Sequence, residues 1–128
     1  MALIQGDFTA LPLPNESVDT VVLHQVLHYA AMPDMVIAEA ARVLRGSGHL
    51  LIVDFAPHDR EELRRDAAHA RLGFSDAQIR GWFAASGLLL ETSESLSGGA
   101  LTVKLWLGRR RSDVVRDPLN SSSRKAAA

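Results

Sequence analysis

Apolar runs and amphipathic segments alternate along this chain. Two apolar runs of strand length, residues 18–23 and 50–53, flank residues 34–44, where apolar side chains recur at helical spacing. Strand, helix and strand in this order predict one β-α-β unit with two parallel strands. Because the second run is apolar throughout, we expect it to be a central strand covered on both faces.

Weaker patterns surround this unit. They predict a short strand from Ala2, a proline-containing loop at 11–17, a charged helical segment at 59–71, a helix at 77–86 capped by Ser75-Asp76, and strands at 88–92 and 101–107. The last two strands are joined through Ser97-Gly-Gly and should form an antiparallel pair. The whole is an α/β domain over residues 1–108, followed by a basic, Ser- and Ala-rich tail, 109–128, that we expect to be disordered.

Composition narrows the class of protein. The chain has 128 residues, enough for one domain, with 47% hydrophobic and 23% charged residues and a net charge of -1. This charge does not favour nucleic acid or an anionic membrane surface. The absence of cysteine excludes disulfides and thiolate metal sites. Because the sequence has no long apolar run and no basic signal-peptide start, we predict a cytoplasmic location.

Polar residues follow both strands of the β-α-β unit. His24 and Gln25 come after the first strand, and Asp54 comes after the second. The carboxyl ends of parallel strands form the edge where open α/β sheets bind ligands. The sequence therefore predicts a small-molecule site at this edge, although a buried, hydrogen-bonded His24 would also fit the pattern.

Several motifs, in their order and spacing, resemble the second half of a class I S-adenosylmethionine-dependent methyltransferase. They are Gly6-Asp7, Leu11-Pro-Leu-Pro, the run from Asp19 to His28, the run from Glu39 to Gly48, and Leu51-Ile-Val-Asp. The similarity covers about residues 2–108 and is greatest to the ubiquinone/menaquinone methyltransferase branch (methyltransferase type 11). Asp54-Phe-Ala-Pro-His and Arg71-Leu-Gly-Phe-Ser also resemble methyltransferase domains that follow an ArsR-type regulator.

The resemblance implies a Rossmann-like, mostly parallel sheet with a C-terminal antiparallel hairpin, and S-adenosylmethionine as the cofactor. It implies that Asp7 accepts a hydrogen bond from the adenine amino group and that Phe8 contacts the ring, roles that suit a carboxylate and an aromatic side chain. Without the resemblance, Asp7 could equally be a turn residue. It also implies that His24 and Gln25 lie beneath the methionine part of the cofactor.

A small-molecule acceptor would lie near the ends of the same strands. The resemblance implies that His28, Tyr29 and Asp54 face it, although local packing or helix capping would also explain these residues. Methyl transfer requires the nucleophile, methyl carbon and sulfur to be held in line. If the acceptor must lose a proton, His24, His28 and His58 are the candidate bases; nothing in the sequence ranks them.

The sequence departs from the family at its N-terminal end. A complete domain begins with a strand and Gly-rich loop, then a second strand ending in an acidic residue, and neither is present. The one G-x-G, Gly46-Ser-Gly48, precedes a strand, so we interpret it as a turn. We expect a sheet truncated by its first two strands, with an apolar edge bared at Val21. The activity of this chain alone is therefore in question.

Three explanations fit this departure: the chain belongs to a longer methyltransferase, it completes its sheet by forming a homodimer, or it is an inactive methyltransferase-like binding module. Other classes lack their signatures. A dehydrogenase would need a dinucleotide loop, and a hydrolase would need G-x-S-x-G. We predict no metal site, because His24 and His28 have helical ligand spacing but no glutamate between them. The basic run 109–111 is a weak signal for nucleic acid.

Overall fold

The computed structural model describes residues 2–3, 8–58, 72–96, 99, 101–112 and 125–127. Asp7 and the charged segment at 59–71 lie outside the described residues. The elements are β1 (Ala2–Leu3), β2 (Val18–His24), the 3-10 helix η1 (Leu27–Tyr29), α1 (Pro33–Val43), β3 (Leu44–Phe55), α3 (Asp76–Ala85), β4 (Leu88–Leu96), β5 (Val103–Arg110) and β6 (Lys125–Ala127).

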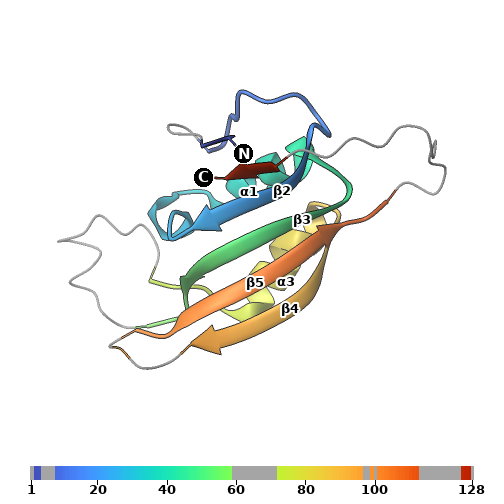
Figure 1. The fold of residues 1–128 in the computed structure, drawn as a ribbon. Coiled ribbons are helices and arrows are strands. Elements are labelled where there is room, and N and C mark those ends of the chain that lie inside the picture. The colour runs from blue at the N-terminus through green and yellow to red at the C-terminus, as the bar shows by residue number, and fades with distance from the viewer. Residues whose placement is uncertain are drawn as a thin grey trace.

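Six strands form one sheet in the order β1-β6-β2-β3-β5-β4 (Figure 1). The strands β1, β6, β2 and β3 are parallel to one another, and β5 is antiparallel to both β3 and β4. The predicted Rossmann-like sheet with an antiparallel C-terminal hairpin is therefore confirmed. The hairpin places β5, the later strand, next to β3.

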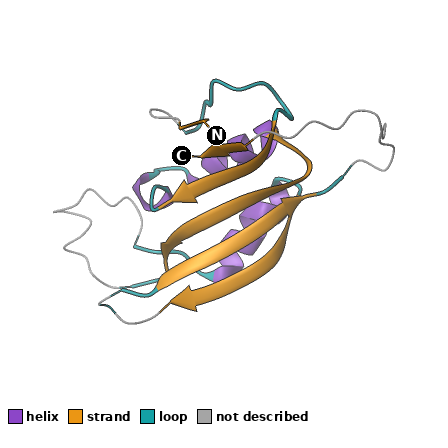
Figure 2. Cartoon of the chain, in the orientation of Figure 1, coloured by secondary structure: helices purple, strands orange, loops and turns teal. Residues whose placement is uncertain are grey.

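The β-α-β unit has the predicted parallel pair. Val21 pairs with Leu50 and Leu23 pairs with Ile52, and all four side chains are buried. The strand β3 is central, as expected. However, α1 and α3 both lie on the same face of the sheet (Figure 2), so these two helices do not cover both faces.

The interpretation of Gly46-Ser-Gly48 as a turn before β3 needs correction. The strand β3 begins at Leu44, and the G-x-G segment lies inside its span. The register with β2 jumps from Val18 opposite Leu44 to Thr20 opposite His49, so this segment bulges out of the ladder. A Cβ on Gly48 would lie 2.9 Å from two backbone oxygens, because the chain passes very close to itself here.

The two helices have different starts. Pro33 is the first residue of α1 and Met32 is its N-cap, without a side-chain cap. Ser75 caps α3, accepting a hydrogen bond from the backbone of Gln78, whose side chain accepts one in return. Both helices pack against the sheet and close a core whose largest fully buried side chains include Trp106, Phe74, Phe83, Leu23, Leu27, Ile37, Leu44, Leu50, Ile52, Ile79 and Leu88.

The edge of β2 that we expected to be bare is paired. The strand β6 lies between β1 and β2, and its residue Ala126 is opposite Val21. This differs from the expectation of disorder over 109–128, since Lys125–Ala127 form a strand. The strand β5 also continues to Arg110, two residues past the expected end of the domain.

Candidate functional site

The chain turns sharply where β2 ends. Gln25 has a φ of 55°, in the left-handed region that few non-glycine residues adopt. Its backbone N–H donates to the carbonyl oxygen of Val53 at 2.7 Å, which extends the pairing with β3 by one residue. This turn brings η1 over the carboxyl ends of β2 and β3, the edge where the sequence predicted a site.

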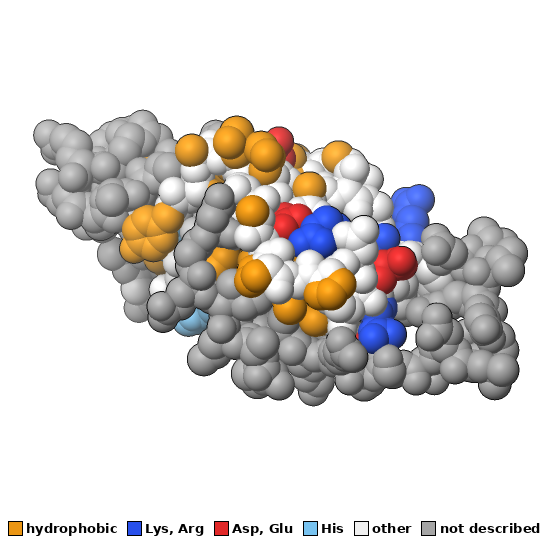
Figure 3. Space-filling view, turned by 90° about the horizontal axis from the view of Figure 1, so that it is seen from above, with side chains coloured by type: hydrophobic (Ala, Val, Ile, Leu, Met, Phe, Trp, Pro, Cys, Tyr) orange, Lys and Arg blue, Asp and Glu red, His pale blue; other side chains and the backbone are white. Residues whose placement is uncertain are grey.

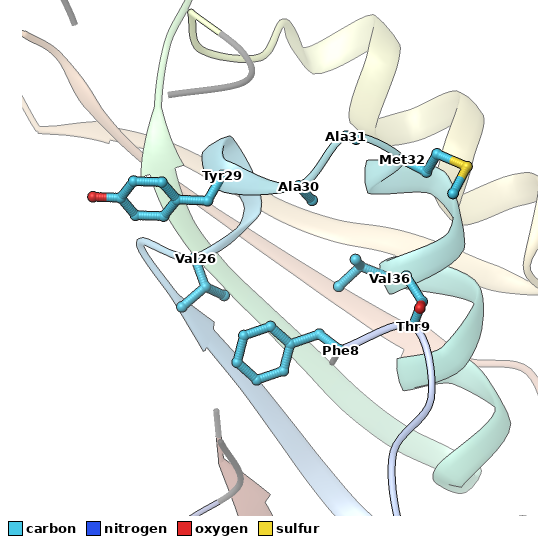
Figure 4. Close-up of a pocket in the computed structure, with 8 residues that line it drawn as sticks. All are labelled: Phe8, Thr9, Val26, Tyr29, Ala30, Ala31, Met32 and Val36. Atoms are coloured by element: carbon cyan, nitrogen blue, oxygen red, sulfur yellow. The ribbon is translucent and has the colours of Figure 1, made fainter. Parts of the chain in front are cut away.

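A pocket of about 440 Å³ lies beside this turn (Figure 4). The side chains of Phe8, Val26 and Val36 face a common space, whereas the ring of Tyr29 points away from it. Among the described residues, no charged side chain lines the pocket, and the two polar lining side chains are Thr9 and Tyr29. The lining residues are Phe8, Thr9, Val26, Tyr29, Ala30, Ala31, Met32 and Val36.

The surface around this end of the chain is partly apolar. Tyr29 and Met32 line the pocket and are each 52% exposed, and Met35 in the first turn of α1 is 44% exposed. Seen from above, hydrophobic side chains are spread over much of the described surface (Figure 3). An apolar pocket with an apolar rim is suited to a ligand with a flat or hydrophobic body.

His28 and Asp54 form a buried pair behind the pocket. The ring Nδ1 of His28 lies 2.7 Å from Oδ1 of Asp54, and the backbone N–H of His28 donates to Oδ2 at 3.1 Å. The backbone N–H of Phe55 also donates to Oδ1, at 2.9 Å. The imidazole ring packs against the rings of Tyr29 and Phe55, with centroids 4.2 Å and 5.1 Å away.

The other predicted site residues are more scattered. His24 is exposed and pairs with Val53, so alternation along the strands places its side chain on the opposite face of the sheet from that of Asp54. Gln25 is half-buried at the turn. His58 lies three residues beyond β3, where its ring packs edge-on against Phe55 at 6.1 Å. The structure thus joins His28 to Asp54, and their roles toward an acceptor stay predictions.

Sequence reasoning did not identify a hydrogen-bond network from α1 that holds the loop between Phe8 and β2. Glu39 Oε2 accepts a hydrogen bond from the backbone of Leu11 at 2.5 Å, and Arg42 donates to Glu39, to Asn15 and to the carbonyl of Leu11. Hydrogen bonding to Glu39 raises the pKa of Arg42. The quoted family motif contained both residues, but their contact with the loop depends on the tertiary structure.

Sequence reasoning also missed most of the pocket lining. Val36 was predicted only as part of the apolar face of α1, and Val26 and Ala30 gave no separate signal. Within the described ranges, no group of three or more His, Asp or Glu side chains could hold a metal ion. None of the described helices is long and apolar enough to cross a bilayer.

Comparisons with known proteins place these features in a family. The sequence profile of a methyltransferase domain family matches residues 1–52. The "Probable S-adenosylmethionine-dependent methyltransferase MT3114" of Mycobacterium tuberculosis is 34% identical over 116 residues, covering 77% of this chain and 41% of that protein. The malonyl-[acyl-carrier protein] O-methyltransferase of Methylococcus capsulatus is 39% identical over 64 residues, covering 50% of this chain and 23% of that protein.

Solved structures share the fold. A candidate methyltransferase from Bacillus halodurans superposes with a TM-score of 0.75 at 17% identity, covering 88% of this chain and 81% of that one. A methyltransferase from Methanosarcina mazei gives 0.68 at 13% identity, covering 84% and 66%. The chain spans 36% and 41% of the first two curated relatives. Fold and sequence together show that the chain belongs to the class I methyltransferases, whose cofactor is S-adenosylmethionine.

Proposed function

We propose that this chain takes part in S-adenosylmethionine-dependent methyl transfer to a small-molecule acceptor. The observation that carries the proposal is the pocket of about 440 Å³ at the carboxyl end of β2, whose described lining residues are mostly apolar. Adenine is a flat aromatic ring, and the side chains of Phe8, Val26 and Val36 would provide apolar surfaces for it. The predicted hydrogen bond from the adenine amino group to Asp7, next to Phe8, agrees with this placement.

The cofactor supplies a sulfonium leaving group and a transferable methyl group when bound. The protein's contribution is to orient the acceptor and exclude water. His28 is enclosed, whereas His24 is exposed on the face of the sheet opposite that of Asp54. Should the acceptor need to lose a proton, the enclosure of His28 disfavours it as the base.

The acceptor is proposed at the level of a small molecule with an apolar body. Support comes from the exposed Tyr29 and Met32 at the pocket. Among the relatives are a fatty-acid O-methyltransferase from Mycolicibacterium smegmatis and the malonyl-[acyl-carrier protein] O-methyltransferase, whose names indicate different acceptors. We therefore assign no single compound to this chain.

We also propose that the rest of the cofactor site comes from a segment outside these 128 residues or from a second copy. The chain spans only 36% and 41% of the first two curated relatives, and the Gly-rich loop with which a complete domain of the family begins is not found in these residues. The strand β6 pairs with only three residues of β2, Thr20 to Val22, so a longer strand could replace it. Light scattering tests the second copy, and a monomer at all concentrations would count against it.

Isothermal titration of this chain with S-adenosylhomocysteine and S-adenosylmethionine tests the proposal. Ala30→Phe places a ring in the pocket and should weaken any binding at least about tenfold, since it removes the space for adenine. Leu89→Phe adds the same ring at an exposed position of β4 and should leave binding unchanged. Measurable binding by the unmodified chain would argue against the alternative, a cofactor-free methyltransferase-like binding module.

A further inference from the structure

Asp54 is a carboxylate with no exposed surface. Burying a carboxylate costs several kcal/mol unless hydrogen bonds replace its hydration. Three donors do so here: the ring Nδ1 of His28, the backbone N–H of His28 and the backbone N–H of Phe55. Toward an ionised carboxylate, which only accepts hydrogen bonds, Nδ1 is the donor. Two of the three donors belong to one residue of η1.

These bonds tie the middle of η1 to the end of β3. Within η1, the backbone hydrogen bonds are 3.2 Å from Tyr29 to Val26 and 3.0 Å from Ala30 to Leu27, the latter closing the turn. A 3-10 turn this short has little stability of its own. The bonds to Asp54, together with the Gln25–Val53 hydrogen bond, therefore fix where the turn lies on the sheet.

The turn held in this way builds most of one wall of the pocket. Five of the eight described lining residues lie between positions 26 and 32, and they flank His28 on both sides. His28 itself does not line the pocket, and its side chain is only 3% exposed. Its imidazole packs against Tyr29 and Phe55. This enclosure fits a residue that shapes the pocket better than one that takes a proton from an acceptor.

We infer that Asp54 and His28 are positioning residues that hold η1 in the conformation that binds the cofactor. The identity of that ligand rests on the proposed function; the hold on the turn does not. If the turn adopts its binding conformation only part of the time, apparent affinity falls by the same fraction. Loss of the pair should therefore weaken binding without altering any side chain that lines the pocket.

The test uses Asp54→Asn, His28→Ala and His28→Asn. Asparagine at position 54 would direct an N–H group toward the donors of His28 or Phe55. Asparagine at position 28 keeps an N–H close to the place of Nδ1, so it can still donate to Asp54 while lacking an imidazole. Asp76→Asn is the matched control, because Asp76 also accepts hydrogen bonds from several side chains but belongs to α3, outside the pocket.

Two measurements are made on each variant that retains the near-ultraviolet circular dichroism of the folded protein. Amide hydrogen exchange over residues 26–31 measures how firmly the turn is held in place. Titration with S-adenosylhomocysteine measures the affinity of the pocket for this ligand. For Asp54→Asn and His28→Ala we expect faster exchange at these amides and affinity lowered about tenfold or more, the scale of a lost charged hydrogen bond. His28→Asn should recover most of both, and Asp76→Asn should change neither.

Unchanged exchange over residues 26–31 in Asp54→Asn would overturn the inference, as would faster exchange with unchanged affinity. Failure of His28→Asn to recover either quantity would also contradict it, because an imidazole rather than a donor would then be required. If the unmodified chain binds no S-adenosylhomocysteine, the proposed function fails separately. The exchange measurement still tests the hold on the turn in that case.

Discussion

Two aspartates, one at the end of β3 and one at the start of α3, each accept several hydrogen bonds but lie in different surroundings. Asp54 at the end of β3 is fully buried, and it fixes η1 beside the pocket. Asp76 at the start of α3 has a side chain that is 46% exposed, and it accepts from Trp106 Nε1 at 2.8 Å, Ser93 Oγ at 3.0 Å and Lys104 Nζ at 2.8 Å.

The difference shows how burial changes the contribution of a carboxylate to the stability of the fold. Water can replace the partners of Asp76, so its bonds join α3 to β4 and β5 at modest gain. Water cannot reach Asp54, so losing one partner would leave a buried polar group unsatisfied. We therefore expect the stability of the pocket region to depend strongly on the His28–Asp54 pair. The stability of the hairpin region should depend mainly on its apolar core.

The largest expected effect compares the same substitution at both sites. Asp54→Asn should lower the free energy of unfolding by about 3–5 kcal/mol, the range for breaking a buried pair. Asp76→Asn should lower it by less than about 1 kcal/mol, as for an exposed pair. Urea denaturation followed by circular dichroism measures both. Equal losses of unfolding free energy would show that burial does not change how much the two carboxylates contribute to stability.

A second prediction concerns Gly73, in the segment that packs against the end of β3 just before α3. Gly73 has a φ of 84°, and a Cβ there would lie 2.0 Å from the carbonyl oxygen of Ala56. The next residue, Phe74, donates its backbone N–H to Phe55 at 2.8 Å, next to Asp54. Gly73→Ala should therefore cost about 2–3 kcal/mol of unfolding free energy through strain and overpacking.

Gly87→Ala is the control for this prediction. Gly87 also has a positive φ, 75°, but nothing lies within 4 Å of the place of its Cβ. We expect it to lose only the backbone contribution, about 1 kcal/mol. Thermal unfolding of both variants measures the difference. A Gly73→Ala variant no less stable than Gly87→Ala would contradict the close approach to Ala56.

The smallest expected effect is the pH dependence of the Asp76 cluster. Hydrogen bonds from Lys104, and then from Trp106, lower the pKa of Asp76 from 3.8 to about 2. A lowered pKa in the folded state contributes stability that is complete above the ordinary pKa and is lost as pH falls through about 2. Because the side chain is nearly half exposed, the contribution should stay below about 1 kcal/mol.

The measurement compares the unmodified chain with Asp76→Asn. The difference in their unfolding free energies should shrink as the pH is lowered from about 4 to about 2, since only one of them can lose this charge. All other carboxyl groups titrate in both proteins and cancel. A difference that stays constant over this interval would show that the cluster does not favour ionised Asp76.

The sequence by itself determined the elements whose signals are local. Apolar periodicity located β2 and α1 to within one residue at each end, and Ser75-Asp76 marked the start of α3. It located β3 as well, but this strand begins six residues earlier than predicted. The parallel pair and the antiparallel hairpin followed from the lengths of the connections. Such features depend on neighbours a few positions apart, so a single sequence carries them.

Only the tertiary structure decided the site. His28 and Asp54 are 26 positions apart, and Leu11 and Glu39 are 28 apart, so no short pattern links them. Their contacts depend on the register of β2 against β3 and on the left-handed turn at Gln25. The pocket lining depends on the same turn. The pairing of β6 depends on the free edge of β2, with which many different strands could pair. Contacts between distant residues are set by packing, which local spacing does not encode.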